Sequence, residues 1–95
     1  MSDLHITENI GRTYPAVINL GRPGRAADDL ISSVIRGGLG ALHGYSCADA
    51  STALSAALVA LDTEEAGYRA AADYLSAVLD ACRAAGASCV LHVNS

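Results

Sequence analysis

Residues 46–86 read SCADASTALSAALVALDTEEAGYRAAADYLSAVLDACRAAG, and this stretch contains two start signals for helices. Ser46 stands three residues before Asp49, and Asp62 stands three residues before Glu65. This is the spacing of a capping box, in which a side-chain oxygen and an acid satisfy the first backbone amides of a helix. The stretch therefore predicts two consecutive helices that begin near Ser46 and Asp62.

The second of these helices has one apolar side. Its apolar positions recur at helical spacing, namely Gly67, Ala71, Tyr74, Leu75, Val78, Cys82 and Ala85. Glu65, Arg69 and Asp73 follow one another at intervals of four on the other side, so that side is expected to face water. Gly86 is a typical residue to end the helix.

The first of the two helices is apolar on almost every side. From Ala53 to Leu61 only Ser55 is polar, and Leu58 and Val59 do not fit a single stripe with their neighbours. Two interpretations remain open. Either this helix lies at the centre between its two neighbours, or part of it is a surface for a second copy or another protein. It is far shorter than the roughly 20 residues that cross a membrane.

The two ends of the chain predict strands. Leu4–Thr7 alternates, Asn9–Gly11 resembles a turn, and apolar residues recur at every second position of Tyr14–Leu20, which together favour a hairpin. Pro15 is expected at a strand end or an edge. Ser88–Val93 alternates again and predicts a closing strand.

Between the hairpin and Ser46 the sequence predicts one more helix. Gly21–Arg25 is a breaker cluster that ends a strand, the apolar residues of Leu30–Ile35 share one helical face, and Gly37-Gly38 ends the helix. Residues 37–45 form a glycine-rich connection. The expected order is β-β-α-α-α-β. This order predicts an α+β fold of one small domain over residues 1–95, with a three-stranded sheet covered on one face by helices.

Composition and charge exclude several classes of protein. A chain of 95 residues with 52% hydrophobic residues and a mean hydropathy of +0.31 is long enough for one folded domain and too apolar for a disordered one. The net charge of −4 comes entirely from residues 41–95. Because binding to nucleic acid or anionic lipid relies on a basic surface, we expect neither nucleic acid nor a membrane as a partner.

The start of the chain and its three cysteines predict a cytoplasmic protein. Met1 runs into Ser2-Asp3 without the basic and apolar regions of a signal peptide. An odd number of cysteines does not favour a disulfide framework.

One local pattern is typical of an anion site. In the Gly21–Arg25 turn, Gly24 allows close approach to the first amides of a helix, and Arg22 and Arg25 are suited to a phosphate or carboxylate. However, the turn lacks the lysine of a P-loop, and Asp28-Asp29 follows at once and repels anions. A solvated turn between strand and helix explains the same residues.

The cysteines and histidines suggest thiol or metal chemistry only weakly. Cys47 at a helix start, four residues after His43, resembles a nucleophile and its base, but no residue is evident as an oxyanion donor. Cys82, Cys89 and His92 suggest a zinc site, but there is no Cys-x-x-Cys pair. We therefore expect no enzyme, no metal and no cofactor, with small buried cysteines and exposed histidines.

The sequence as a whole favours a non-enzymatic protein-interaction module, although no stretch resembles a known family. Such a module is an accessory or inhibitor protein that acts by surface contact, of the kind that phages and mobile elements encode, for example against a host defence complex. We expect a protein partner, with a homodimer as one form of it. The expected contact residues are Arg22, Gly24, Arg25, Leu58 and Val59. The alternative is a domain that binds a small anion or a nucleotide at the Gly21–Arg25 turn.

Overall fold

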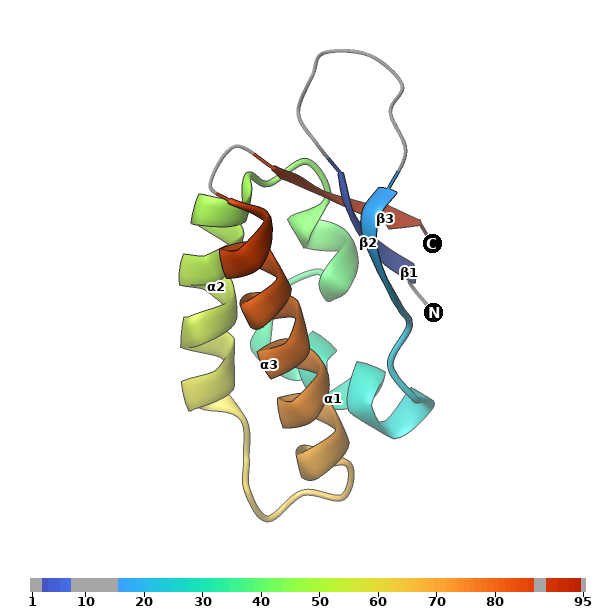
Figure 1. Cartoon of the computed structure of the whole chain (residues 1–95). Helices are drawn as coiled ribbons and strands as arrows, with labels where there is room; N and C mark the ends of the chain where they lie inside the picture. Colours follow the sequence, from blue (N-terminus) through green and yellow to red (C-terminus); the bar gives the residue numbers. More distant parts are fainter. Residues whose placement is uncertain (1–2, 8–15, 87–88, 95) are drawn as a thin grey trace.

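The computed structural model describes residues 3–7, 16–86 and 89–94, and the described chain is mostly helical. In chain order the elements are β1 (Asp3–Thr7), β2 (Ala16–Gly21), α1 (Arg25–Val34), the 3-10 helix η1 (Leu39–Leu42), α2 (Cys47–Ala60), α3 (Tyr68–Ala85) and β3 (Val90–Asn94) (Figure 1). The turn expected at Asn9–Gly11 and the edge position expected for Pro15 lie outside the described residues.

Helices α2 and α3 run side by side and pack extensively on each other (Figure 1). Both present buried residues at the same helical spacing, which are Ala50, Leu54, Ala57 and Leu61 from α2 with its C-cap, and Ala71, Leu75, Val78 and Cys82 from α3. Alanine at the contact lets two helix backbones approach closely. Helix-to-helix packing thus accounts for the buried alanines Ala50 and Ala57 of α2 and Ala71 of α3.

The central helix of the domain is α3. It packs against α2 along one side and against α1 on another, whereas α1 and α2 contact each other only slightly. The interpretation that the helix spanning Ala53–Leu61 is central is therefore wrong. Its outer side faces solvent, and Val59 is 88% exposed there.

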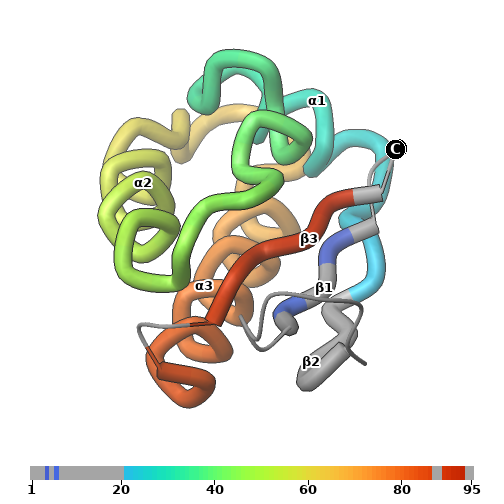
Figure 2. Tube along the Cα trace, turned by 90° about the horizontal axis from the view of Figure 1, so that it is seen from above, coloured from blue at the N-terminus to red at the C-terminus, as the bar shows by residue number. Residues whose placement is uncertain are grey.

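Three short strands lie next to one another at one side of the helices, in the order β2-β1-β3 (Figure 2). Both neighbouring pairs are antiparallel, and the register places Leu4 opposite Val93 and Ile6 opposite Leu91. These four side chains are buried and belong to the same core as Leu39 and Leu42 of η1, Ile31 of α1 and the buried stripes of α2 and α3.

The predicted α+β class, with a three-stranded sheet as a layer covered on one face by helices, is wrong. The domain is mainly helical, and its helices pack chiefly on one another. The strands are contacted mainly by η1, which packs on β3, and by α3, which packs on β2. The physical reason is the matched stripes of α2 and α3, because two apolar helix faces that fit each other are buried without the help of a sheet.

The two predicted helix starts have different outcomes. Ser46 is the N-cap of α2, and its hydroxyl oxygen accepts a 3.1 Å hydrogen bond from the Asp49 amide, as predicted. The start predicted at Asp62 is wrong, because α3 begins at Tyr68. The Asp62 carboxylate instead accepts a 3.0 Å hydrogen bond from the amide of Glu64, which makes a turn. Within the described residues, no helix has the length and apolar character needed to cross a bilayer.

Candidate functional site

A groove of about 440 Å³ lies between α1 and the segment that joins α2 to α3. Its lining comes from two separate parts of the chain, namely Ala26, Asp29, Leu30 and Ser33 on one side and Asp62, Glu65 and Ala66 on the other. We call this site the acidic groove, because three of its seven lining residues carry carboxylates.

One stripe of α1 supplies the first wall of the acidic groove. Its lining residues occur at helical spacing, beside the stripe of Ala27 and Ile31 that is buried in the core. Leu30 is half-buried against that core, so the wall has an apolar base. The hydroxyl of Ser33 donates a 2.6 Å hydrogen bond to the Leu30 carbonyl oxygen.

The second wall depends on a glycine. Gly67 has φ +86°, and a Cβ atom built there would lie 3.1 Å from the carbonyl carbon and from the Cβ atom of Ala26. Only glycine allows so close an approach of the start of α3 to α1 at this backbone angle. The Asp62 turn then places Asp62 and Glu65 across from Asp29.

The acidic groove concentrates negative charge without a cation of its own. Asp29, Asp62 and Glu65 line it, and the residues that line it include neither Arg nor Lys. All three carboxylates are on exposed residues. The space between them is therefore suited to a group of positive charge, whereas an anion would be repelled.

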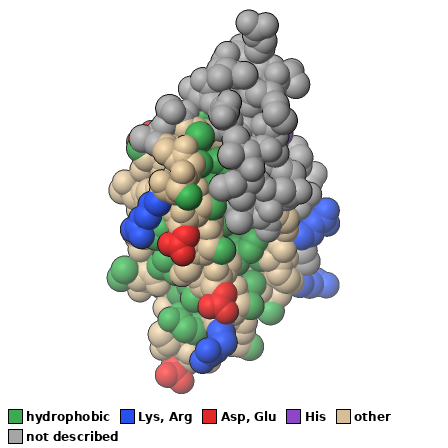
Figure 3. Space-filling model, in the orientation of Figure 1, with side chains coloured by type: hydrophobic (Ala, Val, Ile, Leu, Met, Phe, Trp, Pro, Cys, Tyr) green, Lys and Arg blue, Asp and Glu red, His purple; other side chains and the backbone are tan. Residues whose placement is uncertain are grey.

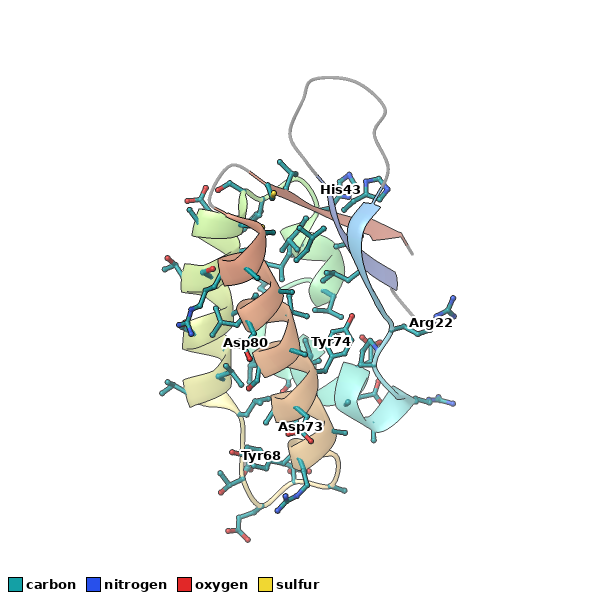
Figure 4. The ribbon with its side chains drawn as sticks, in the orientation of Figure 1. Arg22, His43, Tyr68, Asp73, Tyr74 and Asp80 are labelled. Carbon is teal, nitrogen blue, oxygen red and sulfur yellow. The ribbon has the colours of Figure 1, made fainter. Side chains whose placement is uncertain are left out.

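The structure does not bring the five predicted contact residues together. Arg22, Gly24 and Arg25 lie at the start of α1, while Leu58 and Val59 lie on α2, with α3 between the two helices. All three residues of the first group are exposed, and Arg22 points away from the body of the molecule (Figure 4). Gly24 is the N-cap of α1 and has no side-chain cap.

Of the two predicted α2 residues, only one is a surface residue. Leu58 is half-buried and packs against the core, so it contributes to the fold. Val59 is exposed, and its neighbours Ala56 and Ala60 are small and exposed. A single exposed valine among small side chains is normal for a protein surface.

The cysteines are buried in the core, and none of them forms a disulfide. The Cys82 thiol donates a hydrogen bond to the Cys47 sulfur. The Cys89 thiol donates a 3.1 Å hydrogen bond to the carbonyl oxygen of Ala85. Burial raises the pKa of Cys82 to about 12, with smaller contributions from its bond to Cys47 and from its neighbours. Burial also raises the pKa of Cys47. Because the thiolate is the reactive form, neither thiol is an activated nucleophile.

His92, which the sequence suggested as a zinc ligand together with Cys82 and Cys89, lies on the opposite side of β3 from Cys89. Cys89 is buried next to β3, whereas His92 is exposed on it. His92 instead contacts His43, with ring centroids 4.7 Å apart and an interplanar angle of 64°. In the described part of the chain, no three His, Cys, Asp or Glu side chains are placed to hold a metal ion.

Sequence reasoning missed the acidic groove although it noticed every carboxylate in it. Asp62 and Glu65 were explained as the first turn of a helix, and Asp29 as a residue that weakens an anion site. The groove forms only because the segment joining α2 to α3 folds back onto α1. The stripe of Ala26, Asp29, Leu30 and Ser33 was the available signal, since it mixes polar and apolar residues on one side of α1.

Comparisons with known proteins add no family to this description. The chain matches no protein-family model, and it matches no curated protein and no solved structure.

On the face seen in Figure 3, acidic and basic side chains are interspersed with hydrophobic ones. The functional interpretation therefore rests on the acidic groove.

Proposed function

We propose that this chain is a protein-interaction module and that its acidic groove binds a basic segment of a partner protein. The observation that carries the proposal is the combination of three carboxylates and an apolar base in one groove whose lining contains no cation. An arginine or lysine of the partner fits both features. Its alkyl stem packs on Ala26, Leu30 and Ala66 while its charged head meets Asp29, Asp62 or Glu65.

The chemistry of the described residues supports binding rather than catalysis. The residues that line the groove include neither Cys nor His. The cysteines are buried, and the pKa values of Cys47 and Cys82 are raised. In this proposal the chain is an accessory or inhibitor protein that acts by covering part of its partner. A cytoplasmic location is consistent with the proposal and stays a prediction.

The alternative of an anion site at the Gly21–Arg25 turn has less support. The first turn of α1 contains Asp28, and Asp29 of the groove follows one residue later. Both carboxylates lie near the amides that an anion would approach, and they oppose its binding.

A peptide titration tests the proposed function. The probe is a synthetic peptide of alternating Arg and Leu, added to the ¹⁵N-labelled full chain, with a second peptide that has Glu in place of each Arg. We expect amide shifts at Ala26, Leu30 and Ala66 with the Arg peptide, and weaker binding at higher salt. Absence of these shifts, or equal shifts with the Glu peptide, would overturn the proposal.

A matched pair of variants locates the binding site. Asp29→Asn and Asp80→Asn remove the same charge from exposed positions, but only Asp29 lines the acidic groove. We expect Asp29→Asn to weaken binding of the Arg peptide several-fold, since an ion pair that involves an exposed carboxylate is worth up to about 1 kcal/mol. Asp80→Asn should change it little. An equal loss in both variants would mean that the peptide responds to net charge alone.

A further inference from the structure

His43 completes a ladder of hydrogen bonds along the edge of β3 that faces away from β1. Segment 44–47 runs beside this edge. The Gly44 amide donates to the Leu91 carbonyl oxygen and the Leu91 amide donates to the Tyr45 carbonyl oxygen, both at 2.9 Å. The next amide on the same edge belongs to Val93, and it donates a 3.0 Å hydrogen bond to Nδ1 of His43. The imidazole thus takes the place of a backbone carbonyl in the last rung.

The direction of this bond determines where the His43 proton is. A backbone amide only donates, so Nδ1 holds a lone pair and the ring proton of the neutral imidazole is on Nε2. The same fact argues against a metal site at the histidine pair. A histidine that binds metal through Nε2 carries its proton on Nδ1 and donates from there, which the Val93 amide does not allow.

The ring of His43 lies next to one further titratable ring. From β3 the ring of His92 contacts it. Tyr45, which follows His43 by two residues, is exposed. A positive charge on His43 is therefore placed next to a second histidine whose own protonation adds a like charge.

We propose that His43 is an acid-sensitive latch on the end of β3. When Nδ1 takes a proton from solvent, the acceptor becomes a donor that faces the Val93 N–H, and the last rung of the ladder is lost. Because the bond exists only while Nδ1 keeps its lone pair, protonation of the ring opens the latch. The bond from Leu91 to Tyr45 does not titrate, because both of its groups belong to the backbone. The opening is therefore local to Val93 and the end of the strand.

Amide hydrogen exchange of the full chain tests this proposal. The protection factors of Val93 and Leu91, corrected for the intrinsic rates at each pH, are compared at pH 7.5 and pH 5.0. Loss of one hydrogen bond predicts a fall of about fivefold for Val93. Leu91 is the internal control and should keep its protection. Parallel changes at Val93 and Leu91, or no change at either, would overturn the latch.

Two substitutions assign the response to His43. His43→Asn keeps an oxygen acceptor that does not titrate, so Val93 should stay protected at both pH values. His92→Asn removes the neighbouring charge but leaves the His43 bond, so the fall at Val93 should persist. If His43→Asn responds to pH as the natural chain does, the proton acts elsewhere and the proposal is wrong. Should the variant not fold, the comparison of Val93 with Leu91 in the natural chain still decides.

Discussion

The hydroxyl of Tyr74 donates a 2.9 Å hydrogen bond to the carbonyl oxygen of Gly21, 53 residues earlier in the chain. Tyr74 lies in the middle of α3 (Figure 4), and Gly21 is the last residue of β2, where the chain turns toward α1. The sequence placed Tyr74 on the apolar stripe of its helix but gave no sign of the polar contact. The bond joins the strands to the central helix at the point where α1 begins.

Tyr74→Phe should lower the free energy of unfolding by about 1 kcal/mol, the usual net value of a hydrogen bond between neutral groups. The measurement is urea unfolding followed by circular dichroism. Tyr68→Phe is a suitable control, because it removes a hydroxyl from the same helix at a half-buried residue. The interpretation of Tyr74 fails if the two variants lose the same amount.

Gly67→Ala should destabilise the domain by more than 1 kcal/mol and narrow the acidic groove. The left-handed backbone angle of +86° costs an alanine about 1 to 2 kcal/mol, and its Cβ atom would also press on Ala26. Gly44→Ala is the control, since Gly44 has a similar φ of +84° but no atom within 4 Å of a Cβ built there. Thermal unfolding of both variants separates the backbone cost from the contact with α1. Equal losses would show that α1 and the start of α3 yield to the added methyl group.

Leu54→Ala and Val59→Ala should differ greatly although they lie five residues apart on α2. Leu54 is fully buried, so its truncation is expected to cost about 2 to 5 kcal/mol. Val59 is 88% exposed, and its truncation should stay within about 0.5 kcal/mol. Chemical denaturation measures both. A large loss at Val59 would indicate that a second copy covers this side of α2, which light scattering would reveal as a dimer.

The sequence predicted structural features that depend on neighbouring residues, and it missed those that depend on contacts between residues far apart in the chain. The cap of α2 at Ser46 was predicted because a capping bond spans three residues. The start of α3 was predicted wrongly, because Asp62, which has the same spacing to an acid, forms a turn and does not cap a helix. That turn brings the second wall of the groove onto α1, and its position is fixed by the contact between Gly67 and Ala26 across the fold.

The error in the predicted architecture has a similar origin. The periodicity of each helix and strand showed that one of its faces must be buried. It did not show which helix or strand that face packs against. The Ala50–Leu61 stripe of α2 fits the Ala71–Cys82 stripe of α3, and this match made helix-to-helix packing the dominant arrangement. The His43 bond to Val93 is another contact between distant residues that no local pattern indicates.

The buried thiol of Cys82 predicts a loss of stability in alkaline solution. Burial raises its folded-state pKa from an ordinary value of 9.0 to about 12, so the folded chain holds this proton more tightly than the unfolded chain does. The resulting stabilisation is complete below about pH 9 and is lost as the pH rises toward 12. We expect the midpoint of thermal unfolding to fall across this range.

Cys82→Ala starts from a lower stability, because it leaves a small cavity, but its midpoint should fall less steeply. Both chains contain the same other titratable groups, so the difference between the two slopes reports the thiol. Identical slopes would show that the Cys82 proton does not contribute to the stability of the fold.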